Sequence, residues 1–303
     1  MSQTYSRIHE IPSGHAAEAL IEGCLVLEGG AFRGLYTQGF LDAMMLNDLN
    51  LSCVIGVSAG ALSGLNYVAG QIGRSARINL TYRHDSRYVG ARALLHSHSI
   101  LDVGFLTEDR GIITEPLDEE RFRRPAQRFA AVATNCISGK PTVFEKGKSG
   151  QYLMDGVRAS ATMPYISPML RIKGKPYLDG GCSCAIPYRW AIRQGYRKIL
   201  VIRTRDPLFR KEESRVSPAP RFYRRYPALA LRLVQSDRRY NRQCDEIELL
   251  HKRGRMLRLA PSVPVNVGRV EPDLEKLGQL YWLGYHDCLA RLDEMRDYLA
   301  VSR

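Results

Sequence analysis

CLVLEGGAFRG (residues 24–34) and CVIGVSAG (residues 53–60) each combine a short apolar run with a glycine-containing turn. Such apolar runs are typical of buried strands. Apolar residues then recur at helical spacing after each turn, for example at Leu62, Leu65 and Ala69. Short apolar strands that alternate with helices predict an α/β fold, with a mostly parallel central sheet and helices on both faces.

Later apolar runs predict further strands, and the last hundred residues change in character. Three runs are expected to join the sheet as strands: 129–134, 141–144 and 198–204. Beyond residue 205 a charged, proline-containing stretch, which we interpret as a linker or lid, precedes two mainly helical segments. We therefore expect an α/β domain at residues 22–205 and a mainly helical, basic extension at residues 206–303.

The composition is that of a globular protein in a reducing compartment. Of the 303 residues, 45% are apolar and 25% are charged, which excludes a disordered chain. The seven cysteines include no Cys-x-x-Cys pair, so we expect reduced thiols in the cytoplasm and no metal site. The N-terminus lacks the apolar segment of a secretory signal. The uncharged residues 49–73 are interrupted by glycines and predict a buried strand and helix rather than a membrane span.

The net charge of +13 is concentrated in the C-terminal part of the chain. Residues 205–258 hold 15 Lys and Arg against 7 Asp and Glu, a net charge of +8. A basic surface attracts anionic membranes or nucleic acid, although a solvated helical surface is the simpler interpretation. No zinc finger, RNP-like motif or basic zipper is present, so we expect no nucleic-acid partner. The charge allows an anionic inner-membrane surface as a partner, which the protein would contact peripherally.

Gly56, Ser58 and Gly60 form a Gly-x-Ser-x-Gly motif between a predicted strand and a predicted helix. A serine at such a sharp turn takes a strained conformation that exposes its hydroxyl, and small neighbours avoid collisions with the adjoining strand and helix. The N-terminus of the following helix favours negative charge near the serine. The motif also arises by chance, but its position at a strand–helix junction favours Ser58 as a nucleophile on an elbow formed by Gly56 and Gly60.

The glycine-rich turn that follows the first strand is the candidate oxyanion hole. Its residues Gly29, Gly30, Ala31, Arg33 and Gly34 stand between a predicted strand and a predicted helix. Backbone N–H groups near Gly30 and Ala31 would face a carbonyl oxygen, and Arg33 would fix the loop or add positive potential. A nucleotide-binding turn is the alternative, but the spacing departs from Gly-x-Gly-x-x-Gly and no Gly-Lys-Ser/Thr follows.

Asp179 is the best candidate for the base that a serine nucleophile requires. It follows a strand-like segment and precedes Gly180 and Gly181, which permit a tight base turn and the close approach of a ligand. A carboxylate accepts a serine proton directly when partial burial raises its basicity. Asp155 is the competing residue, which we interpret as a helix N-cap. No histidine lies in a late strand-end loop, where a serine–histidine hydrolase would place its base; the seven are His9, His15, His84, His96, His98, His251 and His286.

Three motifs in this order, GGAFRG (29–34), GVSAG (56–60) and DGG (179–181), resemble those of the patatin-like phospholipase family. The run RASATMP at residues 158–164 adds to the resemblance, which covers residues 22–205. It implies a modified α/β-hydrolase fold and a serine esterase with a Ser-Asp dyad and no catalytic histidine. Ser58 is then the nucleophile, Asp179 the base and the 29–34 loop the oxyanion hole.

The same resemblance implies substrates and a wider context. Members of the family hydrolyse the acyl esters of phospholipids or other lipids, and the dyad needs no metal or organic cofactor. The C-terminal extension resembles that of a bacterial subgroup. Two positions depart from the family pattern: Ala31 stands where many members have a third glycine, and Ala185 stands where an asparagine often follows the DGG motif.

The sequence therefore favours a serine acyl hydrolase of the lipase or phospholipase A type. A non-catalytic patatin-like scaffold that binds lipid or protein through its basic extension is the second hypothesis, motivated by Ala185 and the charge of the extension. A hydrolase with a histidine base is the third. Liposome binding that survives loss of Ser58 distinguishes the second hypothesis, and an indispensable histidine distinguishes the third.

Overall fold

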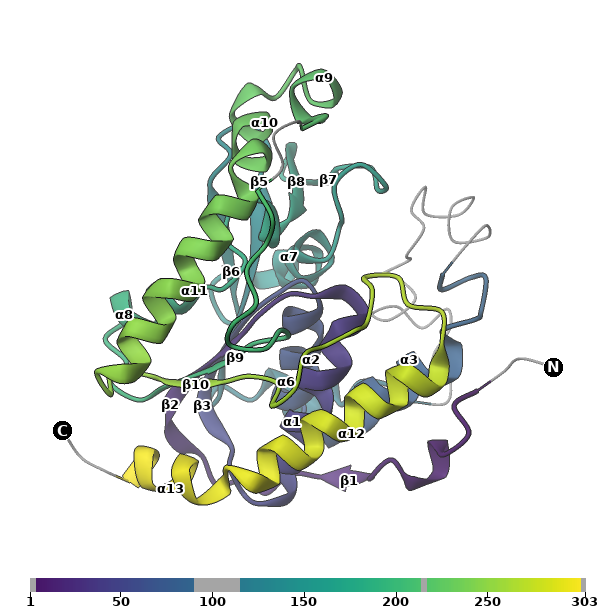
Figure 1. Ribbon diagram of the computed structural model, residues 1–303, viewed down its shortest axis with the longest axis vertical. Coiled ribbons are helices and arrows are strands. Elements are labelled where there is room, and N and C mark those ends of the chain that lie inside the picture. The colour runs from purple at the N-terminus through teal and green to yellow at the C-terminus, as the bar shows by residue number, and fades with distance from the viewer. Residues whose placement is uncertain (1–3, 90–114, 214–216, 301–303) are drawn as a thin grey trace.

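The computed structural model describes residues 4–89, 115–213 and 217–300, which form an α/β fold around an eight-stranded sheet (Figure 1). Seven strands lie in the order β10 (Leu257–Leu259), β9 (Ile199–Ile202), β2 (Ile21–Leu27), β3 (Leu51–Val57), β5 (Arg128–Asn135), β8 (Lys175–Asp179) and β7 (Leu170–Ile172), and β6 (Pro141–Glu145) pairs with β5. The strands from β10 to β5 run parallel, whereas β6, β7 and β8 pair in antiparallel fashion. The expected mostly parallel sheet is confirmed, with an antiparallel portion at one end.

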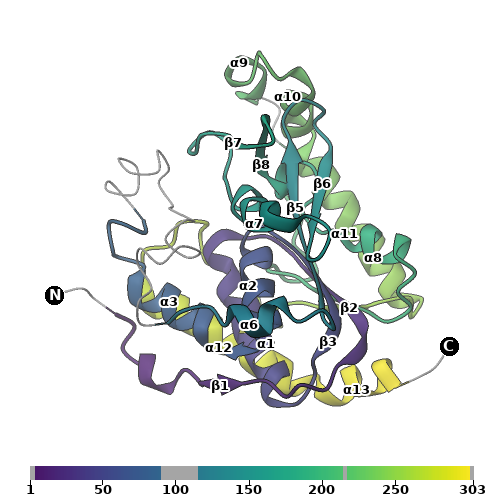
Figure 2. The same cartoon turned by 180° about the vertical axis from the view of Figure 1, so that it is seen from behind.

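Helices cover both faces of the sheet because successive residues of its buried strands point in opposite directions. Leu25 and Leu27 of β2 belong to one core with α1 (Gly34–Leu46), α2 (Ala59–Val68), α7 (Leu153–Ser160) and α12 (Leu274–Ala290). Cys24 and Val26 belong to a second core with α8 (Tyr188–Arg193) and α11 (Ser236–Lys252). Figures 1 and 2 show these two groups of helices on opposite sides of the sheet.

Smaller elements complete the described fold. β1 (Gly14–His15) and β4 (Gln71–Ile72) form a separate two-stranded sheet. The remaining helices are α3 (Arg74–Tyr82), α6 (Glu119–Arg123), α9 (Ala219–Phe222), α10 (Pro227–Val234) and α13 (Leu292–Ala300). The uncharged residues 49–73 divide into β3, α2 and β4, as expected for a buried strand and helix. In the part of the chain that is described, no helix has both the length and the apolar character needed to span a membrane.

The C-terminal helix α12 packs closely along α1, the helix that follows the glycine-rich turn. A Cβ atom at Gly39 of α1 would lie 2.0 Å from the carbonyl oxygen of Tyr281, and one at Gly284 of α12 would lie 2.0 Å from that of Tyr36. These two glycines therefore allow the helix backbones to touch. Since β10 also extends the main sheet, residues beyond 205 contribute to the same core. The division of the chain after residue 205 remains a prediction.

A buried ionic network links the glycine-rich turn to the extension. Arg203, at the end of β9, is fully buried and lies 3.9 Å from Glu28 and 3.7 Å from Glu248 of α11. Arg258 lies 3.1 Å from the same Glu248 carboxylate. Glu28 immediately precedes Gly29, and its carboxylate also accepts a hydrogen bond of 2.7 Å from the backbone N–H of Thr204. The network thus restricts the position of Glu28 at the start of the turn. Removing one member would leave the opposite buried charge without an ion-pair partner.

Candidate active site

Ser58 occupies the sharp turn between β3 and α2, as the Gly-x-Ser-x-Gly motif predicts. Its backbone has φ +55° and ψ −125°, a sparsely populated conformation that costs roughly 1–3 kcal/mol for a residue with a side chain. A Cβ atom at Gly56 would lie 2.4 Å from the carbonyl oxygen of Gly60, and one at Gly60 would lie 2.7 Å from that of Leu27. No side chain fits at either position, so the two glycines are what allows β2, β3 and α2 to converge under Ser58.

Ser160 holds the elbow from beneath, a role that the sequence did not indicate. The backbone N–H of Ser58 donates a hydrogen bond of 2.8 Å to the Ser160 hydroxyl, which in turn donates to the carbonyl oxygen of Val132 at 2.6 Å. Ser160 is fully buried at the end of α7. It lies in the RASATMP run, so that run supplies a direct support for the strained serine.

The glycine-rich turn lies directly against this elbow. A Cβ atom at Gly29 would lie 3.0 Å from the carbonyl oxygen of Val57 and 3.1 Å from the Ser58 Cβ, and one at Gly34 would lie 2.8 Å from the Ala59 Cβ. Gly30 is restricted by a neighbouring strand end instead, since its Cβ would lie 2.8 Å from the Thr204 Oγ1. Glycine at these positions lets the backbone of the turn approach Ser58 closely.

Ala31 adopts φ +50°, the left-handed region that favours glycine. An L-residue with a Cβ atom loses about 1–2 kcal/mol in this conformation. The departure from a third glycine is therefore tolerated at an energetic cost, and the turn keeps its position beside Ser58. Ala31 lines the same two cavities as Ser58.

Asp179 ends β8 and is fixed by hydrogen bonds to its backbone and side chain. Its N–H donates to the carbonyl oxygen of Thr162 at 2.7 Å, and its own carbonyl oxygen accepts from the Thr134 hydroxyl at 2.8 Å. The Gly181 N–H donates to the Asp179 Oδ1 at 2.7 Å. A Cβ atom at Gly180 would lie 2.1 Å from the Val132 carbonyl oxygen, which explains the first glycine of the DGG motif.

The surroundings of Asp179 make its carboxylate a stronger base than an exposed aspartate. Burial raises its pKa to about 6, while hydrogen bonding with the Ser58 side chain and with the Gly181 N–H acts in the opposite direction. The residue is 8% exposed and lines the adjoining cavity. At neutral pH the group is ionised and able to accept a proton from Ser58.

Asp155 and the histidines lie away from this constellation. The prediction that Asp155 caps a helix is wrong: Tyr152 occupies the N-cap of α7, and Asp155 lies inside the first turn, 3.6 Å from Arg158. None of the five histidines in the described ranges lines either cavity beside Ser58. His96 and His98 lie outside the described residues.

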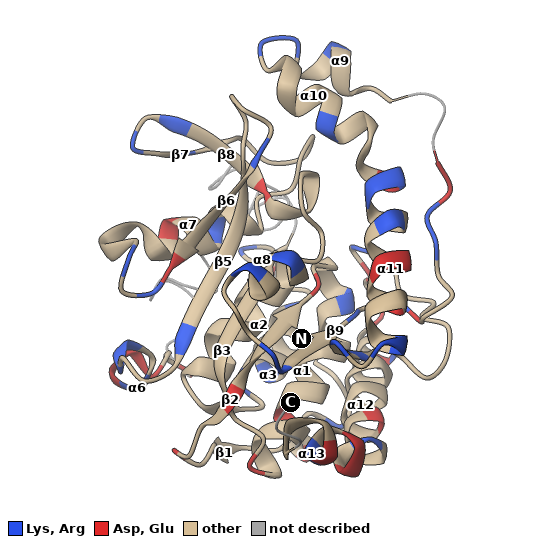
Figure 3. Cartoon of the chain, turned by 90° about the vertical axis from the view of Figure 1, so that its left-hand side faces the viewer, with Lys and Arg blue, Asp and Glu red and all other residues tan. Residues whose placement is uncertain are grey.

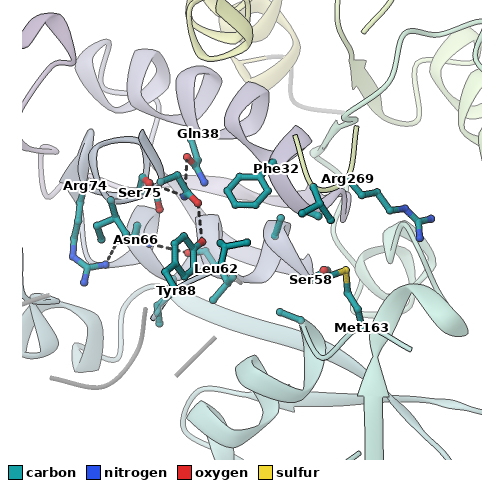
Figure 4. Close-up of a pocket in the computed structure, with 18 residues that line it drawn as sticks. Phe32, Gln38, Ser58, Leu62, Asn66, Arg74, Ser75, Tyr88, Met163 and Arg269 are labelled. Carbon is teal, nitrogen blue, oxygen red and sulfur yellow. Dashed lines mark hydrogen bonds between the residues drawn. The ribbon is translucent and has the colours of Figure 1, made fainter. Parts of the chain in front are cut away.

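Ser58 borders two cavities of different character. The smaller, about 50 Å³, has Leu62, Leu65 and Ile78 in its lining and reaches the polar residues Asn66 and Arg74 at the end away from Ser58 (Figure 4). The larger, about 800 Å³, is lined by Asp179, by the glycine-rich turn and by several basic side chains of the extension. The smaller cavity is thus the more apolar of the two.

Ala185 lines the larger cavity, where the family pattern would often place an asparagine. The turn after Asp179 is braced by hydroxyl groups instead, because Thr134 and Ser183 lie 2.8 Å apart and Thr134 also donates to the Asp179 carbonyl oxygen. No group of three or more potential metal ligands occurs among the residues that the structure describes.

Replacement of Ser160 by alanine is expected to weaken the protein because the buried Ser58 N–H loses its acceptor. An unsatisfied buried donor costs about 1–3 kcal/mol, so urea denaturation should show a loss of unfolding free energy in that range. Ser63→Ala is the matched control, because the Ser63 hydroxyl is buried without a hydrogen-bond partner among the described residues. Equal effects of the two substitutions would contradict the assigned role of Ser160.

Comparisons with known proteins show the family of the chain. The family model described as patatin-like phospholipase matches residues 25–192, and a domain of unknown function, DUF6363, matches residues 226–300. The uncharacterized protein YjjU of Escherichia coli K12 is 30% identical over 185 residues, covering 59% of this chain and 51% of YjjU. The probable lipid hydrolase 463L of Invertebrate iridescent virus 6 is 26% identical, covering 57% of this chain and 64% of the viral protein.

A solved structure shows the same fold. VipD from Legionella pneumophila superimposes with a TM-score of 0.50 at 15% identity, covering 93% of this chain and 68% of VipD. The chain thus spans about half of YjjU and about two thirds of the other two proteins. Because the phospholipase model covers more than half of the chain, the family resemblance inferred from the three motifs is confirmed, and the protein belongs to the patatin-like phospholipase family.

Proposed function

We propose that the protein is a serine acyl hydrolase that cleaves lipid acyl esters through an acyl-enzyme, with Ser58 as nucleophile and Asp179 as base. One observation carries the proposal: the strained Ser58 and the buried Asp179 border the same cavity, and the Ser58 side chain lies near enough to lower the Asp179 pKa. Family membership and the similarity to a viral protein named as a probable lipid hydrolase support it.

The proposed reaction proceeds in two halves. Asp179 takes the proton of the Ser58 hydroxyl as Oγ attacks the ester carbonyl, and the resulting oxyanion accepts hydrogen bonds from backbone N–H groups near Gly30 and Ala31. The alcohol leaves with the proton from Asp179. Water then attacks the acyl-enzyme, again giving a proton to Asp179, and the fatty acid departs as the proton returns to Ser58.

The two cavities suggest how the ester is oriented. The smaller cavity has Leu62, Leu65 and Ile78 in its lining, and its volume of about 50 Å³ suits the first carbon atoms of an acyl chain. The larger cavity contains Asp179 and several other charged side chains in its lining, which suits the alcohol portion of the substrate and the incoming water. In this proposed orientation the leaving oxygen would lie on the side of the base.

Two variants test the proposed dyad in a screen of lipid classes for released fatty acid. Ser58→Ala is expected to abolish turnover of any ester that the wild type cleaves, and Asp179→Asn to lower kcat by at least about a hundredfold, because a general base contributes that much or more. Asp155→Asn is the matched control, because this carboxylate lies on α7 and pairs with Arg158. It should keep most of the activity.

The Asp179 substitution is a fair test because it should not unfold the protein. The pKa of Asp179 is higher in the folded than in the unfolded protein, so ionisation of Asp179 lowers the free energy of unfolding. This penalty is absent below about pH 4 and complete above about pH 6. Asp179→Asn is therefore expected to be at least as stable as the wild type at pH 8. A hydrolysis rate unaffected by Ser58→Ala would instead favour a scaffold whose apparent activity comes from a contaminant.

The pH dependence of kcat/KM should report the same carboxylate. Asp179 must be ionised to accept a proton, and its pKa lies at about 6. The value of kcat/KM is expected to be level between pH 7 and 8 and to fall roughly tenfold per pH unit below 6. A profile that stays level down to pH 5 in folded protein would exclude Asp179 as the base.

We further propose that the protein works in the cytoplasm and touches anionic membranes through one end of the molecule. Five exposed or partly exposed apolar side chains, here called the tip surface, lie on α9, α10 and two adjacent loops: Ile137, Tyr165, Phe222, Leu231 and Val234. Tyr165 packs edge-on against Phe222 with ring centres 5.4 Å apart and also lines the larger cavity. The tip surface therefore adjoins the cavity that contains Asp179.

Basic residues accompany the tip surface. Arg221, Arg224 and Arg225 are exposed on or beside α9, and Figure 3 shows this end of the molecule with basic but no acidic colouring. Each basic residue near an anionic membrane contributes about 1 kcal/mol, and the apolar side chains add affinity by leaving water. A membrane held there would offer its lipids to the adjoining cavity.

Vesicle sedimentation tests this contact in a Ser58→Ala background, where the lipid stays intact. Binding to vesicles of phosphatidylglycerol and phosphatidylcholine should exceed binding to pure phosphatidylcholine and should weaken as salt rises. Phe222→Ser combined with Leu231→Ser is expected to weaken binding at least roughly fivefold, because two apolar contacts are lost. Leu289→Ser, on α12, is the control, and an equal loss with this variant would contradict the assignment of the tip surface.

A further inference from the structure

We propose that the larger cavity holds the phosphate group of the substrate through Arg33, Arg205 and Arg269. The inference rests on the proposed function and narrows the substrate class to acyl esters that carry a phosphate without a cationic substituent. All three arginines line the cavity that also contains Ser58 and Asp179. A phosphate bound among them would belong to the same molecule whose ester reaches Ser58.

The three arginines come from separate parts of the chain. Arg33 ends the 3-10 turn Ala31–Arg33 of the glycine-rich loop, Arg205 follows β9, and Arg269 lies between β10 and α12. The three arginines also influence one another through their charges. Burial is the main reason why the Arg33 pKa falls to about 10, and the charges of Arg205 and Arg269 lower it further. Arg269 also lowers the pKa of Asp179, so its charge acts close to the reacting groups.

In the described part of the chain, no carboxylate forms an ion pair with these three guanidinium groups, and the charge of Glu28 acts on Arg33 only from a greater distance. Among the described residues, neither Arg33 nor Arg269 has a side-chain hydrogen bond or ion pair, and the buried Nε atoms of Arg33 and Arg205 donate to no acceptor. Arg205 donates to the Val265 carbonyl oxygen and stacks on Phe209 at 4.6 Å, contacts that orient it without cancelling its charge.

The other charged groups of the cavity are already matched. Glu28 is engaged by the buried Arg203 and by the Thr204 N–H. Lys211 pairs with Asp237 at 3.4 Å, and Arg210 pairs with Asp245 at 2.8 Å. Asp179 and the exposed Glu212 are the remaining carboxylates of the lining. Three unmatched guanidinium groups thus face two carboxylates, one of which is the proposed base.

This arrangement suits a phosphate better than other polar headgroups. Guanidinium groups bind phosphate oxygens with paired, charge-assisted hydrogen bonds, and a dianionic phosphate would relieve the repulsion among the three arginines. A phosphocholine headgroup would bring a quaternary ammonium into the same cluster and lose much of this attraction. Acylglycerol phosphates are therefore the expected substrates, with the acyl chain beside Leu62 and the phosphate beside Arg269.

The site also gives the C-terminal part of the chain a role. Arg205 and Arg269 lie outside residues 25–192, which match the phospholipase model, and Arg269 lies within residues 226–300, which match the domain of unknown function. Selection of the headgroup would therefore depend in part on Arg269 of the extension, while the proposed chemistry depends on the family domain.

The direct test compares three substrates with identical acyl chains in mixed micelles: an acylglycerol phosphate, the matching phosphocholine and the neutral glycerol ester. The wild type is expected to prefer the acylglycerol phosphate at least tenfold in kcat/KM. Arg269→Gln and Arg205→Gln should each reduce this preference to about threefold or less, mainly by raising KM for the phosphate substrate. Arg210→Gln is the matched control, because Arg210 lines the same cavity but pairs with Asp245, and it should keep the preference.

A binding measurement separates this inference from the proposed function. Calorimetry with inorganic phosphate on the Ser58→Ala protein should detect binding that Arg269→Gln weakens at least fivefold, even if no ester is ever hydrolysed. Failure of the wild type to cleave any ester would overturn the proposed function but leave this phosphate result standing. Phosphate binding without any preference for the acylglycerol phosphate would assign the site to free phosphate and overturn the headgroup proposal, as would a preference unaffected by the two arginine substitutions.

Discussion

The architecture depends on the close approach of three backbone segments beneath Ser58, at points where no side chain fits. The carbonyl oxygens of Gly60 and Leu27 occupy the positions that side chains at Gly56 and Gly60 would need. This convergence holds Ser58 at φ +55°, and the surrounding hydrogen bonds must compensate for the strain. Ser160 supplies one such bond, because its hydroxyl accepts a hydrogen bond from the Ser58 N–H.

The same region connects the family domain to the extension. Glu28, one residue before the glycine-rich turn, is held by Arg203, and Arg203 reaches Glu248 on α11. On the other face of the sheet, α12 touches the backbone of α1 through Gly39 and Gly284. The extension therefore braces both ends of the turn that forms the proposed oxyanion hole. A buried ion pair is a weak source of net stability, but it favours one arrangement because its members cannot be left unpaired.

The sequence predicted those features that depend on local pattern. Apolar runs predicted β3, β5 and β9, and the order of three glycine motifs predicted the family and placed Ser58 and Asp179 on turns. Glycine was expected where backbones approach closely, and the distances around Gly56 and Gly180 give the physical reason. The catalytic assignment of these residues remains a prediction.

Features that depend on contacts between residues far apart in the chain could not be predicted from the sequence. The antiparallel pairing of β7 and β8 depends on contacts between short, weakly apolar segments, and the N-cap interpretation of Asp155 failed because α7 begins two residues earlier. Neither the burial of Arg203 nor the support from Ser160 has a local signal, because each arises from residues far apart in the chain. Of the three arginines proposed to bind phosphate, Arg33 alone was singled out. Arg205 and Arg269 stand in loops without a motif.

Covalent labelling with a fluorophosphonate tests the central claim most directly, because such a reagent traps an activated serine without requiring knowledge of the lipid substrate. Intact-mass and peptide mass spectrometry should show one adduct on Ser58 in the wild type, no adduct in Ser58→Ala, and much slower labelling in Asp179→Asn. Well-folded wild-type protein that stays unlabelled, or an adduct on a different residue, would contradict the account.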